Sequence, residues 1–167
     1  MIACTTITSP LGDLLLVGED GADGFTLTSL SMPGQKNAPA PRPGWRYTAE
    51  PFADVIRRLE AYWAGEPTRF DIPFTPGGTD FQQRVWRALE EIPHGTTTTY
   101  GALTARLRLP RAQTQAVGAA IGANPLLLVR PCHRVIGADG AMRGYAAGVE
   151  RKVHLLTHEG ALQPALI

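Results

Sequence analysis

The residue of this chain best suited to covalent chemistry is Cys132, which lies in the segment Arg130-Pro-Cys-His-Arg134. The apolar run Leu126-Leu-Leu-Val129 precedes this segment. We expect a buried strand or core segment there, leading into a rigid proline that fixes the thiol at the edge of the core. Two arginines and a histidine flank the thiol, and nearby cations favour the thiolate, which is the nucleophilic form of cysteine.

His133 is the candidate base for this thiol. Adjacent side chains alternate on a strand and diverge on a helix, so one bridging water is a better proton route than direct transfer. Glu159 is the candidate orienting partner, because the helix dipole disfavours an anion at a helix C-terminus unless it has a cationic or hydrogen-bonded partner. A solvent-exposed glutamate is the common alternative. A Cys-His-Glu nucleophile of this kind would also suit hydrolases and acyl transferases.

Length and composition limit the number of domains and the cellular compartment in which this chemistry takes place. The 167 residues suffice for one large domain or two small ones. No apolar stretch is long enough to span a bilayer and the start does not resemble a signal peptide, so we expect a cytoplasmic protein without a membrane partner. A reducing compartment disfavours a disulfide between Cys4 and Cys132, and no spacing indicates zinc. Cys4 is interpreted as a small buried hydrophobe.

Residues 1–78 predict a small α+β domain with a short antiparallel sheet and no obvious chemistry. The predicted elements are strands at 2–8, 14–17 and 25–30, a loop at 31–44, a helix at 51–64 and a strand at 69–74. Thr75-Pro-Gly-Gly78 is interpreted as the domain boundary. This half carries six Lys/Arg against nine Asp/Glu, whereas residues 79–167 carry ten against six, which is compatible with phosphate contacts in the second half.

Residues 79–167 predict a mostly helical domain. Thr79 is a good N-cap for a helix with an apolar stripe of Phe81, Val85, Ala88, Leu89 and Ile92. Short helices over 100–107, capped by Thr99, and over 110–123 are joined by a turn and make a helix-turn-helix candidate. The last helix ends at Gly160, and its predicted apolar face comprises Val149, Val153 and Leu156.

The segment Pro131-Cys-His-Arg-Val135 resembles the active-site signature of the O6-alkylguanine-DNA alkyltransferases. The resemblance covers essentially all of the C-terminal half, and the N-terminal half is similar to the smaller α+β domain of that family. The matching motifs, in chain order, are Phe81-Gln-Gln-Arg-Val-Trp86, Tyr100-Gly101, Ala116-Val-Gly118, Asn124-Pro125, Gly144-Tyr145 and His158-Glu-Gly160.

The resemblance implies that Cys132 accepts the alkyl group irreversibly as a thioether, one protein molecule per lesion and without metal or cofactor. His133 would act on the thiol through water, with Glu159 holding the other side of the imidazole. Asn124 would brace the active-site turn, and Tyr100 would polarise the leaving guanine. The implied pocket comprises the main chain of Val135, which would read the exocyclic amine of guanine, and Pro131, Tyr145, Ala146 and Lys152.

The implied partner is double-stranded DNA with an alkylated guanine, met by a monomer. The helix over 110–123 would enter the minor groove, where its alanines and glycines permit close approach, although tight helix packing would also explain them. The base would be flipped into the pocket because O6 is unreachable inside the stack. The residues expected to face DNA are Arg111, Gln115, Ala116, Gly118, Ala119 and Gly122.

Two positions depart from the family pattern. An arginine usually precedes the Ala-Val-Gly of the recognition helix and fills the gap left by the flipped base, but this chain has Gln115. Arg111 is then the only cation on the helix, which predicts weaker or slower DNA repair. Ala147 replaces a common glycine, and its methyl group could narrow the lip of the pocket.

These residues are compatible with four functions. The first is suicidal repair of O6-alkylguanine, with O4-alkylthymine as a further substrate. The second is a lesion sensor without chemistry, against which the presence of Cys132 argues. The third is a thiol acceptor for a small alkylating metabolite, which the Arg-poor helix motivates. The fourth, a cysteine hydrolase, ranks last because it would turn over.

Overall fold

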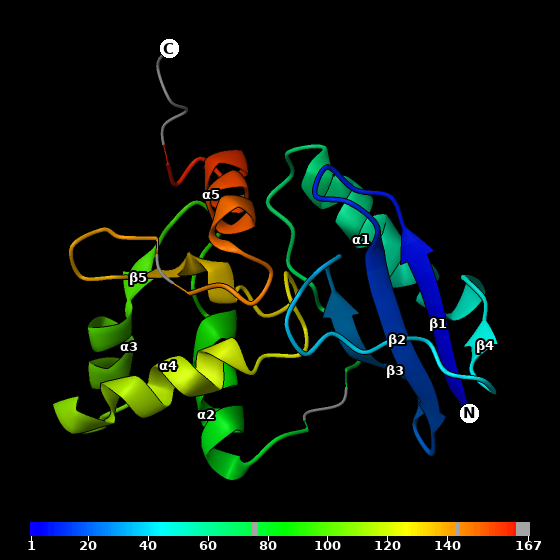
Figure 1. The fold of residues 1–167 in the computed structure, drawn as a ribbon, viewed down its shortest axis with the longest axis horizontal. Helices are drawn as coiled ribbons and strands as arrows, with labels where there is room; N and C mark the ends of the chain where they lie inside the picture. The colour runs from blue at the N-terminus through cyan, green and yellow to red at the C-terminus, as the bar shows by residue number, and fades with distance from the viewer. Residues whose placement is uncertain (75–76, 143, 163–167) are drawn as a thin grey trace. The chain divides into compact units, whose positions relative to one another are not determined.

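The computed structural model describes residues 1–74, 77–142 and 144–162, and the chain divides into two compact units (Figure 1). The first unit comprises Met1–Pro76 together with Pro125–Val129, and the second comprises Gly77–Asn124 and Arg130–Ile167. The chain thus passes from the second unit into the first and back again just before Cys132. No helix in the described ranges is long and apolar enough to cross a membrane.

The first unit is built on a four-stranded sheet in the order β3-β2-β1-β4. The predicted strands are confirmed as β1 (Ile2–Ile7), β2 (Leu14–Gly21) and β3 (Gly24–Ser31), which pair antiparallel. The two-residue strand β4 (Arg46–Tyr47) pairs parallel with β1 and was not expected.

The predicted strand over 69–74 is wrong. Only an isolated bridge joins Phe74 to Leu27, whose amide donates to the carbonyl of Pro73. Proline has no N–H to donate, so it is a poor member of a strand ladder. The run 126–129 is a buried core segment rather than a strand: Leu126 forms a bridge with Leu30, and the positive φ of 68° at Leu128 ends the extended conformation.

The helix predicted over 51–64 is confirmed as α1 (Ala53–Trp63), preceded by the 3₁₀ turn η1 (Glu50–Phe52). Its repeating apolar residues form the expected buried face, because positions three and four apart lie on one side of a helix. The buried residues are Phe52, Val55, Leu59 and Tyr62.

The second unit is mostly helical, and the α+β prediction for the whole chain is confirmed. Its helices are α2 (Asp80–Glu90), α3 (Tyr100–Arg106), α4 (Thr114–Gly122), which follows the 3₁₀ turn η2 (Arg111–Gln113), and α5 (Val149–His158). Thr79 closes a capping box with Gln82, and the Thr99 side chain accepts from the amide of Ala102. The parallel pair β5 (Thr98–Thr99) and β6 (Val135–Ile136) was not predicted.

The predicted apolar face of the last helix is wrong in two of its three positions. Val149 and Val153 are 44% and 38% exposed, and the buried side of α5 carries Lys152, Leu155 and Leu156. The apolar spacing missed this face because one of its members is a lysine, which is buried only where polar partners receive it. The same face ends at Glu159. Helix α5 therefore presents Lys152 and Glu159 to the segment that holds Cys132.

Candidate active site

Cys132 opens the 3₁₀ turn η3 (Cys132–Arg134), which leads into β6. The turn is fixed by its backbone: the amide of Cys132 donates to the carbonyl of Arg130 at 2.7 Å, and that of Arg134 to Pro131 at 3.0 Å. The cysteine is only 5% exposed, so the thiol lies deeper than the edge of the core. Both Cys132 and Cys4 are free thiols.

Burial raises the pKa of the Cys132 thiol to about 11, and this effect outweighs a hydrogen bond with the Asn124 side chain and the charge of Lys152, which both lower it. The expectation that Arg130 and Arg134 favour the thiolate is therefore wrong. Both guanidinium groups bind elsewhere in the second unit, so the cation that acts on the thiol comes from α5.

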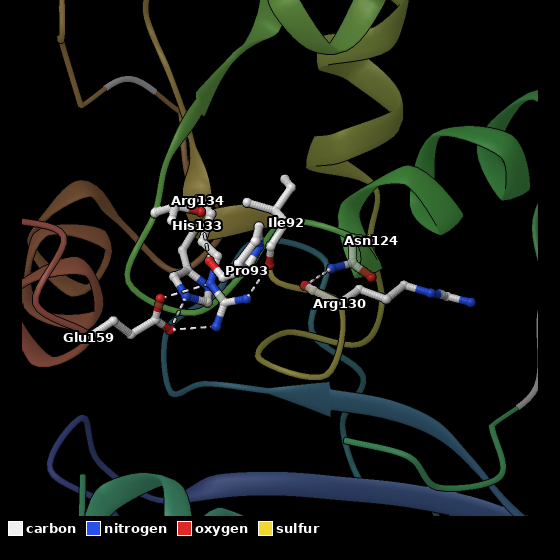
Figure 2. A network of polar contacts seen from close by, with 8 residues as sticks. Ile92, Pro93, Asn124, Arg130, His133, Arg134 and Glu159 are labelled. Atoms are coloured by element: carbon white, nitrogen blue, oxygen red, sulfur yellow. Dashed lines mark hydrogen bonds and ion pairs between the residues drawn. The ribbon is translucent and has the colours of Figure 1, made fainter. Parts of the chain in front are cut away.

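His133 and Glu159 meet as predicted. His133 Nε2 lies 2.7 Å from Glu159 Oε2, and both side chains are buried (Figure 2). An ionised carboxylate only accepts hydrogen bonds, so Nε2 carries the proton and Nδ1 is left as an acceptor. Nδ1 is buried and has no hydrogen-bond partner among the described residues. Burial lowers the pKa of His133 although Glu159 raises it, which favours the neutral imidazole.

Arg134 is a member of this network that the sequence did not reveal. Its Nε donates to Glu159 Oε1 at 2.7 Å and its second terminal nitrogen to Oε2 at 3.1 Å, which makes a buried two-point pair. The remaining nitrogen donates to the carbonyl of Ile92 at 2.7 Å. Burial alone would raise the pKa of Glu159, but hydrogen bonds from His133 and Arg134 hold it well below its usual range.

Asn124 is buried directly before the chain passes to the first unit, and its Nδ2 donates to the carbonyl of Arg130 at 3.0 Å. This bond joins the two ends of the excursion 125–129. Figure 2 shows the Arg130 side chain extending away from Glu159. Its guanidinium instead lies 4.6 Å from the centre of the Trp86 ring.

Lys152 and Tyr100 flank the thiol from α5 and α3. Lys152 is fully buried, and its Nζ donates to the carbonyls of Val135 and Gly144 and lies 5.8 Å from the centre of the Tyr100 ring. Burial lowers the pKa of Lys152 to about 8, and a negative charge at Cys132 raises it. Burial, followed by the charge of Cys132, raises the pKa of Tyr100, so its hydroxyl stays protonated.

Among the other predicted pocket residues, Tyr145 contacts His133 directly and Pro131 directly precedes Cys132. The rings of Tyr145 and His133 meet edge to face with centroids 6.4 Å apart. Pro131 is buried and Ala146 half-buried. Ala147, the departure from the family pattern, is buried, with 7% of its surface exposed.

The predicted DNA-facing residues lie on η2 and α4. Arg111, Gln115, Ala116, Ala119 and Gly122 are exposed. Gly118 differs, because a Cβ placed on it would lie 3.7 Å from the ring of Tyr100. Its lack of a side chain therefore leaves room beside Tyr100. The buried side of α4 carries Val117, Ala120 and Ile121.

Two family models match nearly the whole chain. Residues 80–161 match the model for the 6-O-methylguanine DNA methyltransferase, DNA binding domain, and residues 2–76 match that for its ribonuclease-like domain. These matches agree with the resemblance seen in the sequence motifs.

Individual relatives match over similar lengths. The methylated-DNA–protein-cysteine methyltransferase of Mycolicibacterium paratuberculosis is 46% identical over 99% of this chain and 96% of its own length. The protein of the same name from Methanosarcina acetivorans is 44% identical over 92% of this chain and 95% of its own length.

Solved structures agree with these matches. The O6-methylguanine methyltransferase of Mycobacterium tuberculosis superposes with a TM-score of 0.84 and 43% identity, covering 99% of this chain and 96% of that chain. The OGT of the same organism in complex with DNA superposes with a TM-score of 0.85 and 42% identity, covering 95% of this chain and 93% of that chain. The chain therefore belongs to the 6-O-methylguanine DNA methyltransferase family.

Proposed function

We propose that this protein repairs O6-alkylguanine in DNA by moving the alkyl group irreversibly onto the sulfur of Cys132. The observation that carries the proposal is the buried 2.7 Å contact between Glu159 and His133, which directly follows the buried Cys132 in the turn η3. The names of the relatives and the DNA complex of the Mycobacterium tuberculosis protein support DNA as the partner. The protein would act as a monomer in the cytoplasm.

The residues divide the reaction between them. The thiol proton passes through one water to Nδ1 of His133, whose Nε2–H is held by Glu159. The thiolate sulfur then forms a bond to the alkyl carbon while the carbon–oxygen bond breaks and its electron pair stays on guanine. The protonated hydroxyl of Tyr100 supplies a hydrogen bond or proton to the leaving base. Lys152 stabilises the thiolate during the step.

The product explains why each molecule acts once. The new carbon–sulfur bond is a thioether, which lacks the carbonyl carbon through which a thioester is hydrolysed. No residue of the site therefore regenerates the thiol. The exposed residues of η2 and α4 would face the minor groove while the lesion turns into the site.

The direct test is an intact mass after incubation with a duplex that carries O6-methylguanine. We expect a gain of one methyl group, located by peptide digestion at Cys132 and not at Cys4. A tight complex without a mass gain would instead indicate a lesion sensor. A gain only with a free small alkylator would indicate a metabolite acceptor, and repeated turnover would indicate a hydrolase.

The rate of transfer is expected to rise with pH. Because the pKa of Cys132 is about 11, the thiolate fraction grows about tenfold for each pH unit between pH 6 and pH 8. Above pH 8 the rise becomes less steep, because Lys152, with a pKa of about 8, loses the charge that favours the thiolate. Single-turnover rates between pH 6 and pH 10 measure this, and a flat profile would contradict a rate that depends on proton loss from Cys132.

Replacing Gln115 by arginine is expected to strengthen DNA binding. A charge-assisted hydrogen bond to an orphaned base or phosphate exceeds a neutral one by about 1 kcal/mol, which corresponds to about fivefold in Kd. The slope of log affinity against log salt should also steepen by about one. Titration of a lesion duplex at several salt concentrations measures both, with Gln113→Arg on η2 as the matched control. Unchanged or weaker binding would show that the missing arginine is irrelevant.

A further inference from the structure

Trp86 joins three separate segments of the second unit. It lies on α2, is 3% exposed, and its indole Nε1 donates to the carbonyl of Ala120 in α4 at 2.8 Å. A Cβ placed on Gly78 would lie 2.6 Å from the same indole, so the backbone there packs directly against the ring. The indole is therefore held in one position.

Arg130 occupies a face of this ring. Its guanidinium carbon lies 4.6 Å from the ring centre, and the residue is 2% exposed. Burial lowers the pKa of Arg130, and the charge of Glu90, one helical turn after Trp86 on α2, raises it. Helix α2 thus offers a cation two groups that attract it, an aromatic face and a carboxylate.

The backbone of Arg130 connects this contact to the reacting thiol. Its carbonyl accepts from the side chain of Asn124 at 3.0 Å (Figure 2). The same carbonyl accepts from the amide of Cys132 at 2.7 Å. Asn124 in turn makes the hydrogen bond that lowers the pKa of Cys132. The position of the Arg130 backbone therefore sets the positions of the Asn124 side chain and of Cys132.

We propose that Trp86 and Arg130 form a positioning pair that couples the DNA-facing helix α4 to the turn carrying Cys132. One side of the pair touches α4 through the carbonyl of Ala120, and the other fixes the carbonyl of Arg130. A displacement of α4 on DNA is thereby transmitted to the hydrogen bonds around the thiol. The inference rests on the proposed function, because alkyl transfer is the reaction that the pair positions.

The first test compares Arg130→Met with Arg130→Lys. Loss of the guanidinium removes the contact with Trp86 that holds residue 130 in place. The hydrogen bond from Asn124 to the thiol is thereby weakened, so Arg130→Met should transfer about tenfold more slowly. The rate at which iodoacetamide labels Cys132 at pH 8 should fall about tenfold, because a rise of about one unit in the pKa of the thiol lowers its thiolate fraction by that factor. Arg130→Lys keeps a cation over the ring and should recover most of the rate. Arg87→Met, an exposed charge loss on the same helix, is the matched control.

The second test separates coupling from general stability. Trp86→Phe keeps a ring beneath Arg130 but removes the donor to Ala120. Transfer from a duplex with O6-methylguanine should slow about fivefold, as expected for one lost neutral hydrogen bond, while transfer from the free base O6-benzylguanine stays within about twofold. A purely structural role would lower the melting temperature and slow both substrates equally.

Two results would overturn the inference. One is an unchanged rate of iodoacetamide labelling at pH 8 in folded Arg130→Met. The other is an equal loss of transfer rate on the duplex and on the free base in Trp86→Phe. Near-ultraviolet circular dichroism of each variant reports whether it is folded. The iodoacetamide labelling needs no DNA, so it still tests the Arg130 contact if the unaltered protein gains no methyl group, a result that would contradict the proposed function alone.

Discussion

We expect Cys132→Ser to gain no methyl group from a duplex containing O6-methylguanine, yet to bind that duplex as tightly as the unaltered protein. A serine hydroxyl has nearly the shape of the thiol but is a far weaker nucleophile toward an alkyl carbon, because a hydroxyl ionises much less readily than a thiol. The substitution removes the acceptor and leaves the exposed residues of η2 and α4 intact. Intact mass spectrometry and a binding titration measure the two properties separately.

The matched control for this prediction is Cys4→Ala. Cys4 is fully buried in β1 of the first unit and has no place in the site, so the variant should gain a methyl group at the normal rate. A methyl gain by Cys132→Ser, or its loss in a folded Cys4→Ala, would show that the acceptor has been misassigned.

We expect Glu159→Gln to slow alkyl transfer by about a hundredfold or more, which is the usual contribution of a positioned acid–base group. The carboxylate receives hydrogen bonds from His133 Nε2 and from two nitrogens of Arg134. A neutral amide has one acceptor oxygen and turns its NH₂ group toward one of these donors. The imidazole then loses the partner that keeps its proton on Nε2 and its lone pair on Nδ1.

The same substitution destabilises the protein, because it leaves the buried Arg134 without a counter-charge. Removing one partner of a buried ion pair costs about 3–5 kcal/mol. Urea unfolding measures this loss, and transfer rates are to be compared where the variant is still folded. Glu150→Gln, in the exposed first turn of α5, is the control and should change neither property. A normal rate in folded Glu159→Gln would remove Glu159 from the mechanism.

Local patterns in the sequence predicted that His133 and Glu159 meet next to Cys132, but they did not predict the partners of the neighbouring arginines. Arg130 and Arg134 are equivalent in sequence, since each lies two residues from Cys132. Their partners differ because Arg134 meets a carboxylate 25 residues away, whereas Arg130 meets an aromatic ring on α2. Such long-range partners are set by packing, which apolar periodicity does not encode.

The errors in predicting the fold from the sequence have similar physical causes. The two-residue strands β5 and β6 are too short to show an alternation of apolar and polar residues. Each is a strand only because it pairs with the other. The buried face of α5 was misassigned because Lys152 is received by two carbonyls that lie outside the helix. In the sequence, only an apolar run indicates residues 125–129, and this run does not show that they belong to the first unit.

The burial of Cys132 affects how long the unreacted protein keeps its free thiol. With a pKa of about 11, only about one molecule in ten thousand carries a thiolate at pH 7, so peroxides and stray electrophiles find little to attack. Because each protein molecule reacts only once, the low reactivity of the free thiol keeps unreacted protein available until it meets a lesion.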